Sequence, residues 1–365
     1  MVRSAPLAYP RAVRVLIPVL VLVAAAAAGE EWRCARGNLQ NTGVVKNRGP
    51  VAQPQIAWKY EEKATISRGV ALAFGRLVYG VGEFVVACRR QRSGTELWDA
   101  SVKQQILAWP AIRNDCVYVG SPDRVHYVFN FNTGKEPGAA EAEAAIVADP
   151  AVTEDYYLAG ATDGLFYVMA AKDARPLWKP KTGRVVHGAA VDRGRAYVVN
   201  DKGTVYALDL KKKRELWNLE LNAEPLCAPI LCKGLLWLPL KDAVQGIQIK
   251  RGQAGTRHEL KGISGAPALA KSLLHYGTDQ GEVVVFDVSR GKELRRVKVA
   301  EVAVSSPLIL ARSVIYGAAG STLFAVDAKK GQVLWTFQGE EKFQPPIVAD
   351  KAIYVGAGNV FYCLR

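Results

Sequence analysis

The chain of 365 residues is half hydrophobic and contains 33 glycines, which is enough apolar sequence for a substantial core with many turns. Its 48 Lys and Arg residues against 34 Asp and Glu residues give a formal net charge of +14. This excess favours anionic partners, while length and charge together exclude neither one large β domain nor two smaller ones.

The N-terminus has the pattern of a secretory signal peptide. Three arginines among the first 14 residues precede an unbroken apolar run over 15–28, which ends in small residues. The run is shorter than the ~20 apolar residues that a membrane-spanning helix needs. We therefore predict a signal peptide at 1–28 that is cleaved near residues 27–29, with an uncleaved anchor as the alternative.

The cysteines indicate the compartment but no site. Cys34 lacks the small-residue context of a lipoprotein cleavage site, so we expect a periplasmic or secreted protein that is not a lipoprotein. Export permits disulfides, yet no two cysteines are adjacent and no Cys/His cluster has metal-ligand spacing. Cys227 and Cys232 are expected on one strand with opposite orientations, so they should not pair. We expect buried thiols with at most one disulfide.

Internal repetition is the strongest signal in the sequence. An aromatic residue preceded by apolar residues recurs eight times, with spacings of 38 to 40 residues. The eight positions are Tyr79, Tyr118, Tyr157, Tyr197, Trp237, Tyr276, Tyr316 and Tyr354. A nearly constant spacing of this length indicates a repeat architecture in which each repeat is one structural unit.

Each unit predicts four strands. A segment led by proline or alanine, such as WPAIRN (109–114), comes first, and the aromatic strand follows. After a turn rich in Gly and Asp comes an alternating strand such as VYALD (205–209), and the fourth strand ends in ELW or VLW. Four strands in about 40 residues are typical of β-propellers, in which each unit is a blade around a central axis. The first strand should line the axis, where crowding accounts for its small residues.

The two ends of the chain are predicted to close the ring together. The last unit stops at Arg365, directly after its third strand, and has no fourth strand of its own. Trp58 lies 40 residues before Trp98, which is the phase of the missing strand. We therefore predict an all-β, eight-bladed β-propeller of four-stranded antiparallel blades over 54–365. It follows an N-terminal segment at 29–53 and is closed by an N-terminal strand, which removes an open edge.

The repeat resembles that of pyrroloquinoline-quinone (PQQ)-type propellers. LDLKKKRELW, FDVSRGKELR and VDAKKGQVLW are similar to the family pattern A-x-D-x-x-x-G-x-x-x-W, and WRCARGNLQNTG (32–43) resembles the segment that opens exported members. In this family the tryptophan packs between blades, and the acid precedes the turn. The resemblance implies these structural roles for Trp58, Trp98, Trp178, Trp217 and Trp335 and for Asp209, Asp287 and Asp327. Pro137, His258 and Arg295 stand near expected tryptophan positions, so weaker blade junctions are expected there.

The family divides into enzymes and binding platforms. Quinoprotein dehydrogenases bind PQQ and calcium, usually have longer chains, and often carry adjacent cysteines that form a disulfide; this sequence has neither insertions nor a Cys-Cys pair. Its four histidines fall in different units at unrelated phases, which favours neither a catalytic triad nor a metal site. We therefore expect no cofactor, no metal and no catalytic residue. The resemblance favours the non-catalytic branch of the outer-membrane assembly factor BamB, and a small quinoprotein dehydrogenase is the alternative.

The turns between third and fourth strands predict a basic face, because they emerge on one side of the disc. The residues expected to form this face are Arg89, Arg90, Arg92, Lys211, Lys212, Lys213, Arg214, Lys329 and Lys330. Such a face would bind lipid headgroups, acidic polysaccharide or an acidic protein, whereas the alternative is that these residues only solvate hairpin turns. We expect a monomeric exported scaffold with a protein partner in the cell envelope and no nucleic acid.

Overall fold

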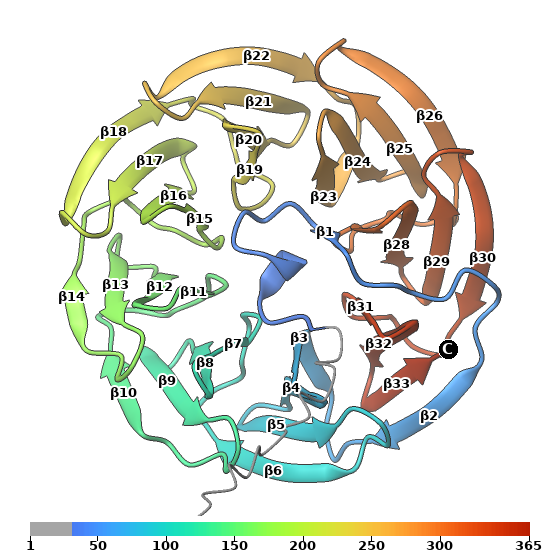
Figure 1. Ribbon diagram of the computed structural model, residues 1–365, viewed down its shortest axis with the longest axis horizontal. Coiled ribbons are helices and arrows are strands. Elements are labelled where there is room, and N and C mark those ends of the chain that lie inside the picture. The colour runs from blue at the N-terminus through green and yellow to red at the C-terminus, as the bar shows by residue number, and fades with distance from the viewer. Residues whose placement is uncertain (1–30) are drawn as a thin grey trace, which may run out of the picture.

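The computed structural model describes residues 31–365 and contains eight β-sheets arranged around a central axis (Figure 1). Each sheet contains one four-stranded antiparallel blade, and one sheet gains the short strand β1 (Val44–Val45), which pairs in parallel with that blade. The predicted eight-bladed propeller is confirmed. The predicted signal peptide lies outside the described residues. Over 31–365, no helix is long and apolar enough to cross a membrane.

Blades 1 to 4 follow one another in chain order, each with its first strand innermost. Blade 1 contains β3 (Ile66–Ala73), β4 (Arg76–Val81), β5 (Val85–Arg90) and β6 (Glu96–Ser101). Blade 2 contains β7 (Ala111–Arg113), β8 (Cys116–Gly120), β9 (Val125–Asn130) and β10 (Gly138–Glu141). Blade 3 contains β11 (Ala151–Val152), β12 (Tyr156–Gly160), β13 (Phe166–Ala170) and β14 (Pro176–Trp178). Blade 4 contains β15 (Ala190–Asp192), β16 (Arg195–Val199), β17 (Thr204–Asp209) and β18 (Arg214–Glu220).

Blades 5 to 8 complete the ring. Blade 5 contains β19 (Ile230–Cys232), β20 (Leu235–Pro239), β21 (Ala243–Gln248) and β22 (Gln253–Glu259). Blade 6 contains β23 (Ile263–Ala270), β24 (Leu273–Thr278), β25 (Glu282–Asp287) and β26 (Lys292–Lys298). Blade 7 contains β27 (Ile309–Ala311), β28 (Val314–Ala319), β29 (Thr322–Asp327) and β30 (Gln332–Gln338). Blade 8 contains β31 (Ile347–Ala349), β32 (Ala352–Ala357) and β33 (Val360–Leu364), with the N-terminal strand β2 (Ile56–Glu61) outermost.

The eight repeat aromatics all lie on the second strands and are buried in the hydrophobic clusters that join adjacent blades. Some of their hydroxyl groups also bond outside their own blade. Tyr118 donates to the Ala171 carbonyl at 2.6 Å, and Tyr316 donates to the Pro50 carbonyl at 3.1 Å. A buried tyrosine that satisfies its hydroxyl in this way packs and orients the sheets at once.

The fourth-strand residues pack on the next blade. Trp98 lies against Gly134 and donates its Nε1–H to the Phe131 carbonyl at 3.0 Å, and Trp217 bonds the Ile249 carbonyl in the same way at 2.9 Å. Gly134 has a positive φ of 69°, and a Cβ there would lie 2.7 Å from the Trp98 ring. Glycine at this turn therefore serves both the backbone conformation and the approach of the neighbouring indole.

The remaining predicted tryptophans have related positions. The Nε1–H of Trp335 donates to the Pro50 carbonyl at 3.0 Å, and Trp58 stacks on Phe361 with ring centroids 6.1 Å apart. Trp178 is half-buried at the end of β14. These positions are set by the repeat, because each residue ends or lies within an outermost strand.

Two residues that replace tryptophan still contact the next blade. His258 lies against Gly291, and its Nε2 is 2.7 Å from the Val288 carbonyl oxygen, which is the bond that tryptophan makes elsewhere. Arg295 lies against Gly331. Pro137 is exposed. The weaker junctions expected at these three blades therefore remain a prediction, with His258 supplying an equivalent hydrogen bond at one of them.

The aspartates that precede the turns accept backbone N–H bonds. Asp209 accepts from the Lys212 N–H at 2.9 Å, and one Asp327 oxygen accepts from the N–H groups of Lys329 and Lys330, each at 2.8 Å. These backbone bonds lower the pKa of Asp327, and bonds from Ser289 lower the pKa of Asp287. Asp287 and Asp327 therefore stabilise their tight turns in the charged form.

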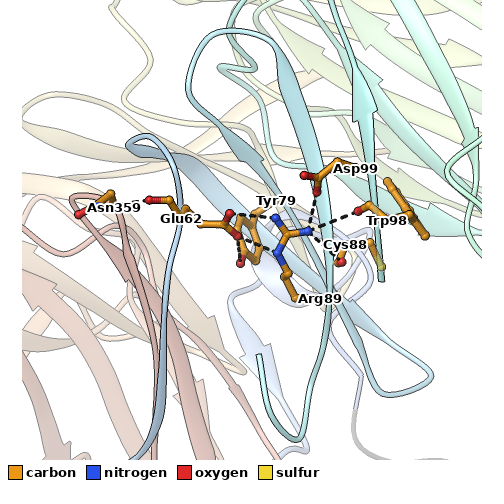
Figure 2. A network of polar contacts seen from close by, with 7 residues as sticks. All are labelled: Glu62, Tyr79, Cys88, Arg89, Trp98, Asp99 and Asn359. Carbon is orange, nitrogen blue, oxygen red and sulfur yellow. Dashed lines mark hydrogen bonds and ion pairs between the residues drawn. The ribbon is translucent and has the colours of Figure 1, made fainter. Parts of the chain in front are cut away.

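The ring closes where β2 pairs antiparallel with β33, as predicted. Glu62 follows β2 directly and forms an ion pair with Arg89 of blade 1, and both side chains are at least 96% buried. Arg89 donates through Nε and Nη2 to the two Glu62 carboxylate oxygens, both at 2.9 Å, and Tyr79 donates to Glu62 at 2.8 Å (Figure 2). Arg89 also bonds the Asp99 carboxylate at 2.5 Å. We call Glu62, Tyr79, Arg89 and Asp99 the closure network.

The closure network corrects one predicted surface residue. Arg89 was expected on a basic face, but its side chain is 2% exposed and paired with two carboxylates. It lies on β5 rather than in the turn that follows, and its orientation along the strand points it inward. Burial alone would lower the pKa of Arg89, but the bonds to Glu62 and Asp99 raise it, so the residue stays charged.

The N-terminal segment lines the inside of the ring, which the sequence did not predict. It contains the 3₁₀ turn η1 (Ala35–Gly37) and the short strand β1 (Val44–Val45), and it crosses the centre of the disc (Figure 1). Its backbone carbonyls accept hydrogen bonds from backbone N–H groups of seven blades, on the innermost strands or just after them. The donors are Leu72, Ile112, Val191, Leu231, Leu269, Leu310 and Lys351. The segment therefore satisfies strand edges that would otherwise be unpaired.

Candidate functional site

A cavity of about 800 Å³ lies at the centre of the propeller. Its walls come mainly from the connections that lead into the first strands, including Trp109, Asp149 and His187. The N-terminal segment contributes Cys34 and Arg36 to the lining. The N-terminal segment bonds the first strands near the ends that lead into the second strands, so it closes the centre of the propeller on that side. The cavity therefore opens on the side of the connections that lead into the first strands.

Asp149 is the one carboxylate among the residues that line this cavity. Its Oδ1 accepts the Trp109 backbone N–H at 2.9 Å. Burial raises the pKa of Asp149, while the Arg68 guanidinium and the Trp109 bond act in the opposite direction. Trp109 packs flat across Gly69, where a Cβ would lie 2.5 Å from the indole, so the wall beside the acid is apolar and fixed.

Three guanidinium groups line the same cavity. Arg36 bonds the Leu308 carbonyl at 3.1 Å and the Pro267 carbonyl, and burial lowers its pKa to about 10, which leaves it charged at neutral pH. Arg68 and Arg184 are exposed, and within residues 31–365 their side chains make neither a hydrogen bond nor an ion pair. The cavity therefore carries more positive than negative charge, and two of its three guanidinium groups bond no other group of the described chain.

The other reactive groups of the cavity are in their neutral forms at pH 7. Burial raises the pKa of Cys34 and of Cys227 to about 12, which keeps both thiols protonated. Burial lowers the pKa of His187, whose Nε2 lies 3.3 Å from the Pro225 carbonyl oxygen. A protonated thiol is a poor nucleophile, so this arrangement does not favour covalent chemistry.

All six cysteines are free thiols. The sequence placed Cys227 and Cys232 on one strand, but only Cys232 lies on β19, whereas Cys227 precedes that strand in a connection and lines the cavity. The prediction of a shared strand was therefore wrong, because the strand begins three residues after Cys227.

The donor set does not fit a calcium and quinone site. Calcium takes six to eight oxygen ligands, usually with several carboxylates. Over residues 31–365, no three His, Cys, Asp or Glu side chains converge as a metal site, and Asp149 is alone in the cavity. We therefore derive no catalytic step through such a group.

The predicted basic residues other than Arg89 are all exposed, and they lie in the turns between third and fourth strands or, for Arg90 and Arg214, on the strand residues that border these turns. They are Arg90, Arg92, Lys211, Lys212, Lys213, Arg214, Lys329 and Lys330. They lie on blades 1, 4 and 7, which are spread around the disc (Figure 1). We call these eight residues the basic turns. None of them makes an ion pair within the part of the chain that is described.

The sequence analysis missed the polar residues of the cavity. Trp109 and Asp149 each precede a proline at the same phase of neighbouring repeats, where other units carry small residues such as Ala228 and Ala266. Asp149 is an acid at a repeat position that precedes a first strand and otherwise carries small residues, so the sequence alone could have indicated it as a residue near the central axis. Arg68 and Arg184 gave no comparable signal, because they lie outside this position.

A family model described as "Outer membrane protein assembly factor BamB" matches residues 51–137, 138–237 and 240–363. The chain belongs to this PQQ-repeat propeller family. The predicted family resemblance is thereby confirmed. No curated protein sequence matches the chain.

Solved structures share the fold of this PQQ-repeat propeller at low sequence identity. The computationally designed Ika8 protein aligns with a TM-score of 0.76 and 18% identity, covering 85% of this chain and 100% of its own. BamB from Moraxella catarrhalis aligns with a TM-score of 0.70 and 14% identity, covering 86% and 98%. A quinohemoprotein alcohol dehydrogenase from Comamonas testosteroni aligns with a TM-score of 0.75 and 12% identity, covering 92% and 80%. At these identities the likeness shows the fold alone, and the family includes both non-catalytic and catalytic proteins.

Proposed function

We propose that this protein is an exported, non-catalytic propeller that binds a protein partner in the cell envelope. The composition of the central cavity carries the proposal: one carboxylate, protonated thiols and a neutral histidine give neither a metal site nor an activated nucleophile. Family membership agrees with a binding role, because the description of the matching family model names an assembly factor. Cleavage of the signal near residues 27–29 and a monomeric state are parts of this proposal.

The basic turns are the surface that we assign to the partner. They are exposed, and the second-to-third strand turns that lie on the opposite face carry acids such as Asp163 and Asp201. A partner with an acidic surface would be steered to this side of the disc, and its binding would weaken as salt rises. Anionic lipid headgroups are the competing occupant.

Charge reversal in the most basic turn tests the assignment. Lys211, Lys212, Lys213 and Arg214 are changed together to glutamate, and envelope proteins are recovered by crosslinking to the tagged propeller. The matched control changes Lys63, Lys103, Lys202 and Lys261 to glutamate, because these exposed lysines lie in turns and connections of the other face. The partner is expected to be lost in the first variant and kept in the control.

Two outcomes would contradict this proposal. If both variants recover the same proteins with the same salt dependence, the basic turns do not bind the partner. If the protein reduces a dye acceptor with an alcohol after loading with PQQ and calcium, the alternative of a small quinoprotein dehydrogenase replaces the scaffold. Vesicles with and without phosphatidylglycerol distinguish lipid from protein as the anionic surface.

A further inference from the structure

The central cavity has features that the proposed scaffold does not use. Its volume of about 800 Å³ lies within the range of roughly 300–1,000 Å³ that small-molecule sites occupy. It is open on the face opposite to the basic turns, so a ligand there would not compete with a partner on them. One apolar wall is formed by Trp109 and by Leu107, which is 44% exposed.

Arg36 supplies charge to the cavity, but its guanidinium is already held in place by one bond from each Nη, to the Leu308 and Pro267 carbonyls. Arg68 and Arg184 differ, because their guanidinium groups line the cavity without a bonded partner in the described chain. A guanidinium presents its N–H groups in a planar fork that matches a carboxylate bidentately.

Arg68 stands at the opening. It lines both the central cavity and an adjoining groove of about 280 Å³, which also contains Lys342. Ser305 and Pro307 are likewise shared by the two spaces. Two cations, Arg68 and Lys342, therefore line the adjoining groove, whereas Asp149 and Trp109 line the central cavity alone. The balance of three guanidinium groups against one carboxylate leaves room for a ligand with at least two negative charges.

We propose that the central cavity binds a carboxylate-bearing anion between Arg68 and Arg184, with Trp109 against its apolar part. The ligand carries two or more carboxylates, either on a small organic acid or on acidic side chains of a polypeptide. Asp149 opposes the ligand charge and thereby limits its affinity. The inference goes beyond the proposed scaffold function and depends on neither the basic turns nor a protein partner.

Calorimetric titration with citrate tests the site in the purified protein. Arg68→Gln and Arg184→Gln are each expected to weaken citrate binding about tenfold or more, because each removes charge-assisted bonds. The matched control is Arg193→Gln, which should leave binding unchanged. Arg193 is an exposed arginine in the turn between β15 and β16, with one ion pair to Asp192. Unaltered thermal unfolding of the two cavity variants would show that they fold, as expected for side chains without bonds.

A variant of opposite sign strengthens the test. Asp149→Asn keeps an oxygen that can accept the Trp109 N–H but removes the negative charge, so citrate binding should tighten several-fold. Tetraglutamate with an amidated C-terminus, compared with tetraglutamine, separates polypeptide carboxylates from small acids. Binding of either carboxylate probe with this mutational pattern supports the site.

The proposal is overturned if neither probe binds, or if binding is the same in the wild type and both cavity variants. It is also overturned if Asp149→Asn weakens binding while the protein remains folded. None of these results bears on the crosslinking experiment, because neither variant of that experiment changes Arg68, Arg184 or Asp149. Failure of this inference and failure of the proposed scaffold function are therefore distinguishable.

Discussion

Replacing Glu62 with glutamine tests whether the closure network stabilises the ring. The change keeps the shape of the side chain but removes the charge that Arg89 meets through two bonds of 2.9 Å. Removing one partner of a buried ion pair costs about 3–5 kcal/mol, because the other charge stays buried without compensation. Asp99 remains bonded to Arg89 and is 36% exposed, so we expect the lower end, about 3 kcal/mol.

Thermal unfolding measures this loss. An unfolding entropy of about 2.1 cal/mol/K per residue, over the ring, converts about 3 kcal/mol into a fall in Tm of about 4 °C. Glu61→Gln is the matched control, since Glu61 is an exposed neighbour on β2 and should change stability by no more than about 0.5 kcal/mol. The double variant Glu62→Gln with Arg89→Met should recover part of the loss, because the unpaired charge is gone.

Equal Tm values for the Glu62 and Glu61 variants would refute this reasoning. Such a result would mean that water or backbone rearrangement compensates Arg89 as well as Glu62 does. An additive double variant would likewise contradict it, because residues in one bonded network should show a coupling energy.

Two further predictions concern the blades. Gly134→Ala should destabilise the fold by about 1–3 kcal/mol more than Gly194→Ala in urea unfolding, because both have positive φ but only Gly134 faces Trp98, while Gly194 has nothing within 4 Å; equal losses would contradict a docking role for Trp98. Burial lowers the pKa of His126 to about 3, below its value near 6.5 in the unfolded chain, so the unfolded state binds the extra proton and stability falls as pH drops from 6.5 towards 3. His126→Leu should therefore flatten the stability profile between pH 6.5 and 4 by up to about 1.4 kcal/mol per pH unit, and an unchanged slope would contradict the argument.

The repeat made the architecture predictable. Eight aromatics at a constant spacing define the second strands, and the phase of Trp58 relative to Trp98 identifies β2 as the missing outer strand. Both predictions succeed because they rest on local strand pattern and on counting. Periodicity reports the same environment eight times, so an irregular unit does not obscure it.

Predictions about single side chains were less reliable, because a one-residue change of register reverses the direction of a side chain. Arg89 was assigned to a turn, yet β5 extends to Arg90 and places Arg89 inside. The route of the N-terminal segment was not predictable either. It contributes backbone carbonyls, which any residue can supply, to strands far away in the sequence. Arg68 became a candidate ligand residue only through the cavity that distant connections form.

The closing strand also determines when the molecule can finish folding. β2 is among the first strands to be synthesised, but its partner β33 lies about 300 residues later in the chain. The N-terminal segment must also wait for its partners, because the seven blades that it bonds are synthesised one after another. Until the last residues arrive, β2 is an unpaired edge, and contacts of such long range form slowly. Removal of β33 should therefore leave a chain that is prone to aggregate, because β2 keeps an unpaired edge.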